Sequence, residues 1–467
     1  MASINKSLTS FNVNGIILVA TTVVFLYCYI IQGFLIQSSF SIAGFGGVFF
    51  FMLNKIGKEI PIKELMIVIL SLQLLISPLI AYHYYNNEME FEMYIEESVY
   101  ILFVLIYILA FTIGLFLPVF KLKNETKFEV FKLEKEDNNG TIGTFLIVLG
   151  FIAYFLASFM PASLKFVFYL FSYSRLIGAF FLIFSNLRRR YLITMLVYGH
   201  FAYIIISTTL FYDLIIWGFF LYMVLEIRLQ SSFPRKLLII VVGAMALMFL
   251  QSIKSDYRKE VSEKDVFSET SNFETFVETS SQTTDETDES EKSNFEHLVT
   301  RLNTGWIISS VLVYTPHYQS FTNGKLLLED VQNVFIPRFL VPGKKSVGGD
   351  ENRDKFEQFT GRRLREDTTM RIGVLADAYV NFGYFGGALL MLIFGLAING
   401  FIQFFKTKYF NTTNYLWIFF IFSFTIRMSD FLVILNSTFK SFIIFLVIGF
   451  LIKLLFIPIK KSTNDLL

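Results

Sequence analysis

Cysteine is nearly absent from this chain of 467 residues, because Cys28 is the only one. A single cysteine excludes an intramolecular disulfide and any zinc site built on cysteine ligands. Charged residues are also scarce, at 17% of the chain, and the formal net charge is only +2. The molecule as a whole is therefore not a binder of nucleic acid or other polyanions. A site for an anion has to come from a local arrangement of basic residues.

Motifs for nucleotide-driven or metal-driven chemistry are missing too. The sequence contains no Walker A motif, no GxGxxG after a strand, no HExxH and no Asp-rich metal loop. We expect neither a cofactor nor a metal, and chemistry whose energy comes from the substrate itself.

Hydrophobic side chains, by contrast, make up 54% of the chain and aromatic side chains 18%. This composition is typical of polytopic membrane proteins. Apolar windows long enough to cross about 30 Å of hydrocarbon predict an all-α polytopic membrane protein with about twelve transmembrane helices. The windows are 14–34, 38–54, 64–84, 97–119, 140–160, 162–184, 191–209, 211–228, 236–253, 374–405, 414–433 and 437–458. Residues 14–54 and 191–228 leave the count open, because each stretch forms either one re-entrant segment or two short spans.

The distribution of Lys and Arg orients these windows. Basic residues concentrate in alternate short loops, such as Arg188 to Arg190, whereas a loop of the other set is acidic from Glu88 to Glu97. The positive-inside rule then predicts that both termini are cytoplasmic. The predicted organisation is nine transmembrane helices in 1–253, one large extracytoplasmic loop in 254–373 and three more transmembrane helices in 374–467.

The large loop has two halves of different composition. Residues 254–296 are acidic, and Ser, Thr, Glu and Asp dominate 268–293, so we expect this half to be disordered. Residues 297–373 are basic and begin with polar and apolar residues at helical spacing. This pattern predicts interfacial helices, with Trp306 and Tyr314 at the membrane surface.

Basic side chains recur through the second half of the loop. Around Arg338, two prolines keep the backbone extended, so that the loop presents Arg338, Lys344 and Lys345. Arginine offers a bidentate fork to phosphate oxygens, so this segment is a candidate phosphate clamp, and the alternative is an ordinary basic surface loop. Further candidates are Arg301, Arg362, Arg363, Arg365 and Arg371. If Thr368 or Thr369 caps the next helix, its N-terminal amides point toward an anion held above it.

Several polar residues fall inside predicted spans. Asp377 leads a cluster with Tyr379 and Asn381, and a carboxylate at that depth usually has a function or a partner. The simpler interpretation is a pair with Arg371 that positions the helix.

Arg175 lies well within the sixth window. It either lines a phosphate site or pairs with Asp213 or Asp430. Arg427 and Asp430 are three residues apart, so on a helix they would share a face and neutralise each other.

Two histidines differ in their setting. His200 lies within a predicted span and is interpreted as a packing residue. His317 lies outside the membrane near the arginines, so it is the better candidate for a base.

Two stretches carry a resemblance to a known family. The segment Ile336-Pro-Arg-Phe-Leu-Val-Pro-Gly-Lys-Lys345 and the run Asp377-Ala-Tyr-Val-Asn-Phe-Gly-Tyr-Phe-Gly-Gly387 resemble those of Wzy-type oligosaccharide repeat-unit (O-antigen) polymerases. These proteins are similar in architecture to O-antigen ligases. The similarity covers residues 297–400. Val341 stands where the family often has Trp, and Asp377 stands where it often has Glu.

The resemblance implies a reaction at the outer face of a bacterial inner membrane. A glycan would move from undecaprenyl pyrophosphate to a sugar hydroxyl of a second lipid-linked repeat unit, without a metal. The implied partners are the undecaprenyl-pyrophosphate-linked oligosaccharide, the lipid bilayer, a flippase and a chain-length regulator.

Roles for individual residues follow as hypotheses. Arg338 and Arg371 would bind the pyrophosphate, and Arg175 would reach it from below. Asp377 or His317 would accept the proton of the acceptor hydroxyl. The supporting substrate contacts would come from Arg301, Lys344, Lys345, Arg362, Arg363, Arg365, Tyr379 and Asn381.

Other functions fit the same sequence. An O-antigen-type ligase would use the same arginine chemistry. A lipid-linked oligosaccharide flippase or other transporter would show internal repeats and charges across its midplane helices, and the two halves of this chain show no clear repeat. A polyprenyl-phosphate-sugar glycosyltransferase would normally carry a carboxylate in the first external loop, and residues 33–39 contain none.

Overall fold

A computed structural model describes residues 2–84, 92–118, 138–207, 211–246, 299–300, 302–335, 350–365, 368–409 and 413–456. Helices dominate these residues, and no strand occurs among them beyond one isolated bridge. The helices of the first half are α1 (Ala2–Leu26), η1 (Tyr27–Ile31), α2 (Ile36–Lys55), α3 (Ile62–Ser71), η2 (Leu72–Ile76), α4 (Ser77–Tyr84), α5 (Glu97–Phe116), α6 (Asn139–Ala157), α7 (Ala162–Ser172), α8 (Ser174–Ile183), α9 (Arg190–Ser207) and α10 (Phe211–Leu229). Those of the second half are α14 (Gly305–Tyr314), α15 (Lys325–Phe335), α16 (Asp350–Thr360), α17 (Val374–Tyr409), η6 (Thr413–Leu416), α18 (Trp417–Phe422), η7 (Thr425–Arg427) and α19 (Phe431–Phe456).

Eight helical segments of the described residues are long and apolar enough to cross a membrane. They are Asn14–Ile31, Ile36–Lys55, Ile62–Tyr84, Glu97–Phe116, Asn139–Ala157, Leu164–Ile183, Val374–Thr407 and Phe431–Phe456. The chain is therefore a helical protein with the character of a membrane protein. The predicted number of twelve spans is not confirmed.

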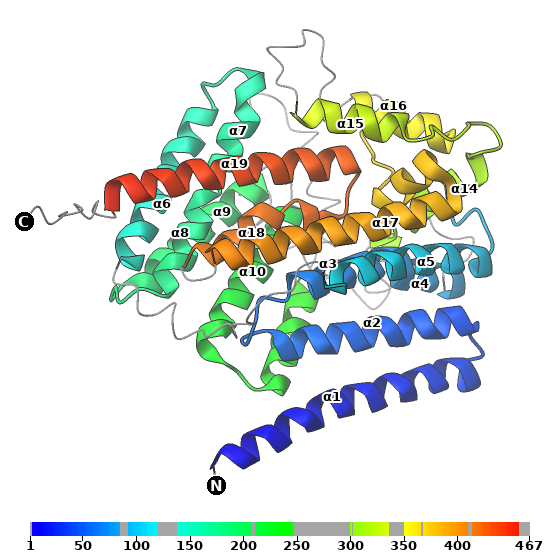
Figure 1. The fold of residues 1–467 in the computed structure, drawn as a ribbon, viewed down its shortest axis with the longest axis horizontal. Helices are drawn as coiled ribbons and strands as arrows, with labels where there is room; N and C mark the ends of the chain where they lie inside the picture. The colour runs from blue at the N-terminus through cyan, green and yellow to red at the C-terminus, as the bar shows by residue number, and fades with distance from the viewer. Residues whose placement is uncertain are drawn as a thin grey trace, which may run out of the picture.

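The two windows whose span count was left open each contain two helices. Residues 14–54 form two helices, α1 and α2, and residues 191–228 form α9 and α10. Within the window 236–253, residues 236–246 are helical and the remainder lies outside the described residues. Figure 1 shows the long helices running roughly side by side, with α1 and α2 at one margin and α15 and α16 at the opposite one.

Helices α5 and α17 make the closest contact of the bundle through small residues. A Cβ on Gly114 would lie 2.2 Å from the carbonyl oxygen of Leu392, and one on Gly395 would lie 2.4 Å from that of Phe111. The two backbones can approach this closely only because both positions lack a side chain. This contact fixes α17 along α5.

Helix α17 is kinked at Gly383, whose φ of 68° lies in the region that favours glycine. The Tyr107 hydroxyl donates to the Gly383 carbonyl over 2.9 Å and holds the kink against α5. Asp377, Tyr379 and Asn381 therefore lie on a short helical piece that precedes the long span, so the predicted window 374–405 is not one straight helix.

The predicted span 414–433 is also not a continuous helix. Helix α18 ends at Phe422, a short 3-10 turn follows as η7, and Met428 has a positive φ of 48° before α19 begins at Phe431. Arg427 and Asp430 therefore do not share a helical face, and the prediction that they neutralise each other is wrong.

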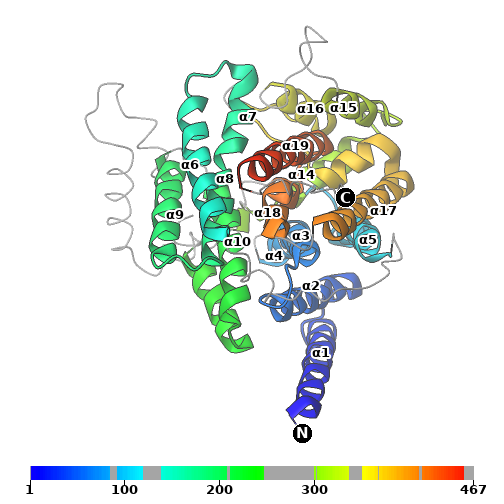
Figure 2. The ribbon, with the colours of Figure 1, turned by 60° about the vertical axis from the view of Figure 1, so that its left-hand side comes forward.

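The segments beyond α10 pack more deeply than predicted. Trp306 is buried against Phe356 of α16, and α14 is buried on all sides from Gly305 to Leu312. This helix is therefore not an interfacial one, because its Ser and Gly residues pack inside the protein. Figure 2 shows α15 and α16 next to α19, and α6 to α9 together on the left, where α7 contacts α19. Residues 254–298 and 336–349 lie outside the described residues.

Candidate functional site

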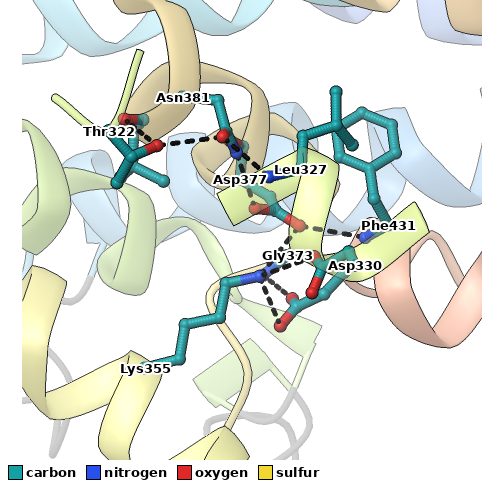
Figure 3. A network of polar contacts seen from close by, with 10 residues as sticks. Thr322, Leu327, Asp330, Lys355, Gly373, Asp377, Asn381 and Phe431 are labelled. Atoms are coloured by element: carbon teal, nitrogen blue, oxygen red, sulfur yellow. Dashed lines mark hydrogen bonds and ion pairs between the residues drawn. The ribbon is translucent and has the colours of Figure 1, made fainter. Parts of the chain in front are cut away.

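The densest group of buried charges surrounds Lys355 of α16 (Figure 3). Its Nζ lies 3.0 Å from Oδ2 of Asp377, 3.5 Å from Oδ2 of Asp430 and 3.9 Å from Oδ2 of Asp330. These carboxylates come from α17, from the residue before α19 and from α15. We call these four residues the Lys355 cluster, and it ties four chain segments together.

Lys355 reaches this position because of the spacing along α16. Asn352, Phe356 and Phe359 form the buried stripe of that helix, and Lys355 falls on the same face by its spacing of three and four residues. Burial lowers the pKa of Lys355, but attraction by Asp377, Asp430 and Asp330 outweighs it and raises the pKa overall. The ammonium therefore stays charged.

Two helix N-termini face each other in the Lys355 cluster. The amide of Gly373, before α17, donates to Oδ1 of Asp430 over 2.8 Å, and the amide of Phe431, at the start of α19, donates to Oδ2 of Asp377 over 3.0 Å. Each helix thus supplies the carboxylate near the other's first turn, where the helix dipole favours negative charge. The predicted caps Thr368 and Thr369 are wrong, since α17 begins later, at Val374.

Asn381 joins the Lys355 cluster to the loop before α15. Its Nδ2 donates to the backbone oxygen of Asp377 over 2.9 Å, and its Oδ1 accepts from Thr322 Oγ1 over 2.9 Å and from the Leu327 amide over 3.0 Å. Tyr379 is buried, and its hydroxyl donates to the Thr315 carbonyl over 3.0 Å. Both residues, predicted as substrate contacts, make hydrogen bonds within the protein, and their role toward a substrate stays a prediction.

The charges of the Lys355 cluster balance only if Asp330 holds a proton. Burial, followed by the neighbouring carboxylates, raises the pKa of Asp330 to about 7, although Lys355 opposes the shift. Two helix N-termini contribute about half a charge each. Together with the ammonium of Lys355, these partial charges offset two of the three carboxylates. The third carboxylate, that of Asp330, takes up a proton near neutral pH.

Two arginines, which we call the arginine pair, lie on adjacent segments that are joined by hydrogen bonds from Gly373 to Asp430 and from Val374 to Met428. Arg371 is exposed and lies two residues before Gly373, and Arg427 lies three residues before Asp430. Desolvation by the surrounding protein lowers the pKa of Arg371, Asp430 raises it and the charge of Arg427 lowers it again. The two like charges are therefore close enough to repel each other.

Arg427 has its own neighbours. It forms an ion pair with Asp213 and lies over the rings of Phe424 at 4.4 Å and Tyr212 at 5.2 Å. One carboxylate therefore leaves the buried Nε of this guanidinium without a hydrogen bond among the described residues.

The turn after α14 carries His317, which is exposed. This turn packs on the arginine-rich segment, because a Cβ on Gly361 would lie 2.3 Å from the Tyr314 ring. Arg363 and Arg365 are exposed there, whereas Arg362 lies over the rings of Tyr94 at 4.1 Å and Trp306 at 5.5 Å. The structure thus brings His317 and these arginines to one surface.

Arg175 lies elsewhere, at the start of α8, and is only 2% exposed. The alternative that it pairs with Asp213 or Asp430 is wrong, because Asp213 binds Arg427 and Asp430 binds Lys355. Arg301, Arg338, Lys344 and Lys345 lie outside the described residues. Their roles stay predictions.

Sequence reasoning missed Lys355 and Asp330, because both lie in charged stretches that are typical of solvated helices. The buried phenylalanines of α16 are the signal that would have found Lys355. Asp377 does have an ionic partner, as expected, but the partner is Lys355 and not Arg371. Among the residues that the structure describes, no group of three or more His, Cys, Asp or Glu residues is placed to hold a metal ion.

The fold and this cluster define a class: a helical protein with apolar helices of membrane-spanning length, whose buried charges gather where broken helices begin. A family model described as "Domain of unknown function (DUF8712)" matches residues 23–460, and the chain therefore belongs to this family. No curated protein and no solved structure is detectably similar to it.

Proposed function

We propose that this chain is a membrane glycosyltransferase that polymerises lipid-linked glycan repeat units. It would work at the outer face of a bacterial inner membrane, with both termini in the cytoplasm. The donor would be a glycan on undecaprenyl pyrophosphate, and the acceptor would be a sugar hydroxyl of a second lipid-linked repeat. The resemblance of residues 297–400 to Wzy-type polymerases motivates this choice.

The observation that carries the proposal is the arginine pair. Hydrogen bonds from the amides of Gly373 and Val374 to Asp430 and Met428 bring together the segments that carry Arg371 and Arg427, and Arg371 is exposed. A dianionic group such as a pyrophosphate would bridge two arginines on adjacent segments. Fixed arginines at that position favour a leaving group whose negative charge grows in the transition state.

The reaction follows from these roles. The acceptor hydroxyl oxygen attacks the anomeric carbon, the bond from that carbon to the pyrophosphate oxygen breaks, and the lipid pyrophosphate leaves with the electron pair. We assign the hydroxyl proton to His317, which is exposed, rather than to Asp377, which is fully buried and held by Lys355. Asp377 then acts by positioning α17 and α19.

One test compares Arg371→Gln with Arg189→Gln, an exposed arginine on the connection before α9. Chain extension by purified protein on lipid-linked repeats is expected to fall by about 10² to 10³-fold in the first variant, as for the loss of one transition-state contact. The second variant is expected to behave like the wild type. Unchanged polymer length and rate in Arg371→Gln would show that the arginine pair is not the clamp.

A transporter for lipid-linked oligosaccharides is the second candidate, and one observation favours it. Helix α17 is kinked and the chain between α18 and α19 is broken next to a buried charge cluster, as in transporters built on discontinuous helices. Deleting the gene separates the candidates. Loss of a polymerase leaves single repeats on the outer leaflet, loss of a ligase leaves long unattached polymer, and loss of a transporter leaves single repeats on the inner leaflet.

A further inference from the structure

A second buried cation lies in a different part of the fold and lacks a counter-charge. Arg175 of α8 is 2% exposed, and its Nε and Nη1 have no hydrogen-bond partner among the described residues. His200 of α9 lies beside it, and its Nδ1 is also buried without a partner. Burying polar nitrogens without hydrogen-bond partners costs free energy, so two such groups side by side call for a functional explanation.

Two rings of α6 enclose these groups. The Arg175 guanidinium lies 4.9 Å from the centre of the Tyr154 ring and 5.4 Å from that of Phe151. The His200 ring lies 5.0 Å from the Phe151 ring and 5.7 Å from the Tyr154 ring. Cation–π contacts attract the guanidinium but accept none of its N–H groups in ordinary hydrogen bonds, so Nε and Nη1 stay without a hydrogen-bond partner among the described residues.

This group lies at the level of the last two turns of α6. A Cβ on Gly150 would lie 2.5 Å from the Arg175 amide nitrogen, so the Arg175 backbone is level with Gly150. Helix α6 ends at Ala157, which places that backbone about 10 Å below the helix end and the Tyr154 ring about 5 Å below it. The long arginine side chain carries its charge toward the shallower level.

The outward surface at this level is apolar. Ile152, Phe155 and Phe159 are 52%, 65% and 68% exposed near the end of α6, and Tyr203 of α9 is 50% exposed. Helices α6 and α9 both pack on α8, and their side chains meet where Phe151 and Tyr154 lie against His200. A molecule with a phosphate head and an apolar tail matches it, since the tail covers the exposed rings while the phosphate meets Arg175 and His200.

We propose that Arg175 and His200 form a second anion site, separate from the arginine pair, for the phosphate of a polyprenyl-phosphate lipid carrier that enters sideways between α6 and α9. This site would hold the second lipid-linked substrate and so rests on the proposed function, because a polymerase holds two lipid-linked substrates at once. Two lipid phosphates in one molecule require two cationic sites.

The test uses the full chain in nanodiscs and measures binding of undecaprenyl phosphate by native mass spectrometry. Arg175→Met is expected to weaken binding at least tenfold, and His200→Phe about threefold. The control Arg228→Met removes an arginine whose Nη1 donates to the Ile183 carbonyl, and it is expected to bind as the wild type does. Arg175→Lys keeps the charge and is expected to retain part of the affinity, so it carries the test if Arg175→Met does not fold.

Competing ligands decide what the site recognises. If phosphatidylglycerol binds as tightly as undecaprenyl phosphate, Arg175 binds ordinary lipid headgroups and the assignment to a polyprenyl-phosphate carrier is wrong. Inorganic phosphate that binds equally well would overturn the lipid assignment, and equal binding by wild type and Arg175→Met would overturn the site. Because the arginine pair also binds lipid phosphate, the same comparison is made in the Arg371→Gln background, where the remaining binding is expected to be lost on adding Arg175→Met. Loss of transfer in Arg371→Gln alone tests the proposed function, so failure of the site and failure of the proposed function give different results.

Discussion

Lys355 and Arg175 are both buried cations, but Lys355 is surrounded by carboxylates and Arg175 by aromatic rings. Lys355 has three carboxylates within 3.9 Å, and two helix N-termini share those carboxylates. Arg175 has two aromatic rings and no ion pair among the described residues. A paired buried charge holds helices in register, whereas an unpaired one is retained for a partner that comes from outside the chain.

The largest expected effect on stability comes from removing Lys355, the buried cation that has carboxylate partners. Lys355→Met would leave three carboxylates without their common cation, and the cost of breaking a buried pair is about 3 to 5 kcal/mol. We expect a large fall in the thermal unfolding midpoint in detergent. Lys325→Met, on the exposed face of α15, is the matched control and is expected to unfold as the wild type does. Equal midpoints for the two variants would mean that the Lys355 cluster does not hold the helices.

A smaller effect is expected where the Lys355 cluster meets the loop before α15. Asn381→Leu leaves the Leu327 amide without a buried partner and removes the hydrogen bond to Oδ1 of Asp377, whose Oδ2 keeps Lys355 and the Phe431 amide; the loss costs about 2 to 3 kcal/mol in free energy of unfolding. Thr322→Val removes only one of the bonds to Asn381 and is expected to cost about 1 kcal/mol. Chemical denaturation in detergent checks the order. A larger loss for Thr322→Val would contradict it.

The pH dependence of stability sharpens the comparison further. The pKa of Asp330 is about 7 in the folded chain, above its ordinary value of 3.8. The folded state thus binds this proton more tightly than the unfolded state, so the associated stability is present below about pH 4 and is lost as pH rises through about 7. We expect the unfolding midpoint to fall across this window in the wild type and to fall less in Asp330→Asn. Identical slopes would refute the assignment.

The smallest expected effect on stability comes from removing Arg175, the buried cation without an ion pair among the described residues. Arg175→Met removes a buried charge that has no ionic partner in the described chain and replaces it with an apolar side chain of similar length. We expect the unfolding midpoint to stay the same or to rise, because an apolar substitute avoids the desolvation cost. The measurement is thermal unfolding in lipid-free detergent. A fall as large as that of Lys355→Met would place Arg175 among the structural charges.

Local patterns account for the part of the fold that the sequence predicted. Hydropathy located the segments that form α2, α5, α6 and α19, because burying an apolar helix depends on its own residues. The same reasoning failed at 414–433, where apolar composition predicted a continuous span. The break there is held by Asp377, a residue more than fifty positions earlier that binds the first amide of α19.

The candidate site also has one feature that the sequence predicted and one that only the structure shows. The expectation that Asp377 needs a partner came from the cost of a carboxylate in an apolar helix, which is a property of the residue and its neighbours. The identity of the partner was wrong because Arg371 is near in sequence while Lys355 is near in space. Periodicity does not show that α15, α16, α17 and the start of α19 converge on one point.

The sequence by itself determined that this chain forms apolar helices and that its few buried charges need a reason, because both follow from residue composition and local spacing. Only the tertiary structure decided which charges meet. The free-energy cost of burying an ion depends on residues from distant segments that pack around it. Lys355 meets three carboxylates and stabilises the fold, whereas Arg175 has no carboxylate near it among the described residues.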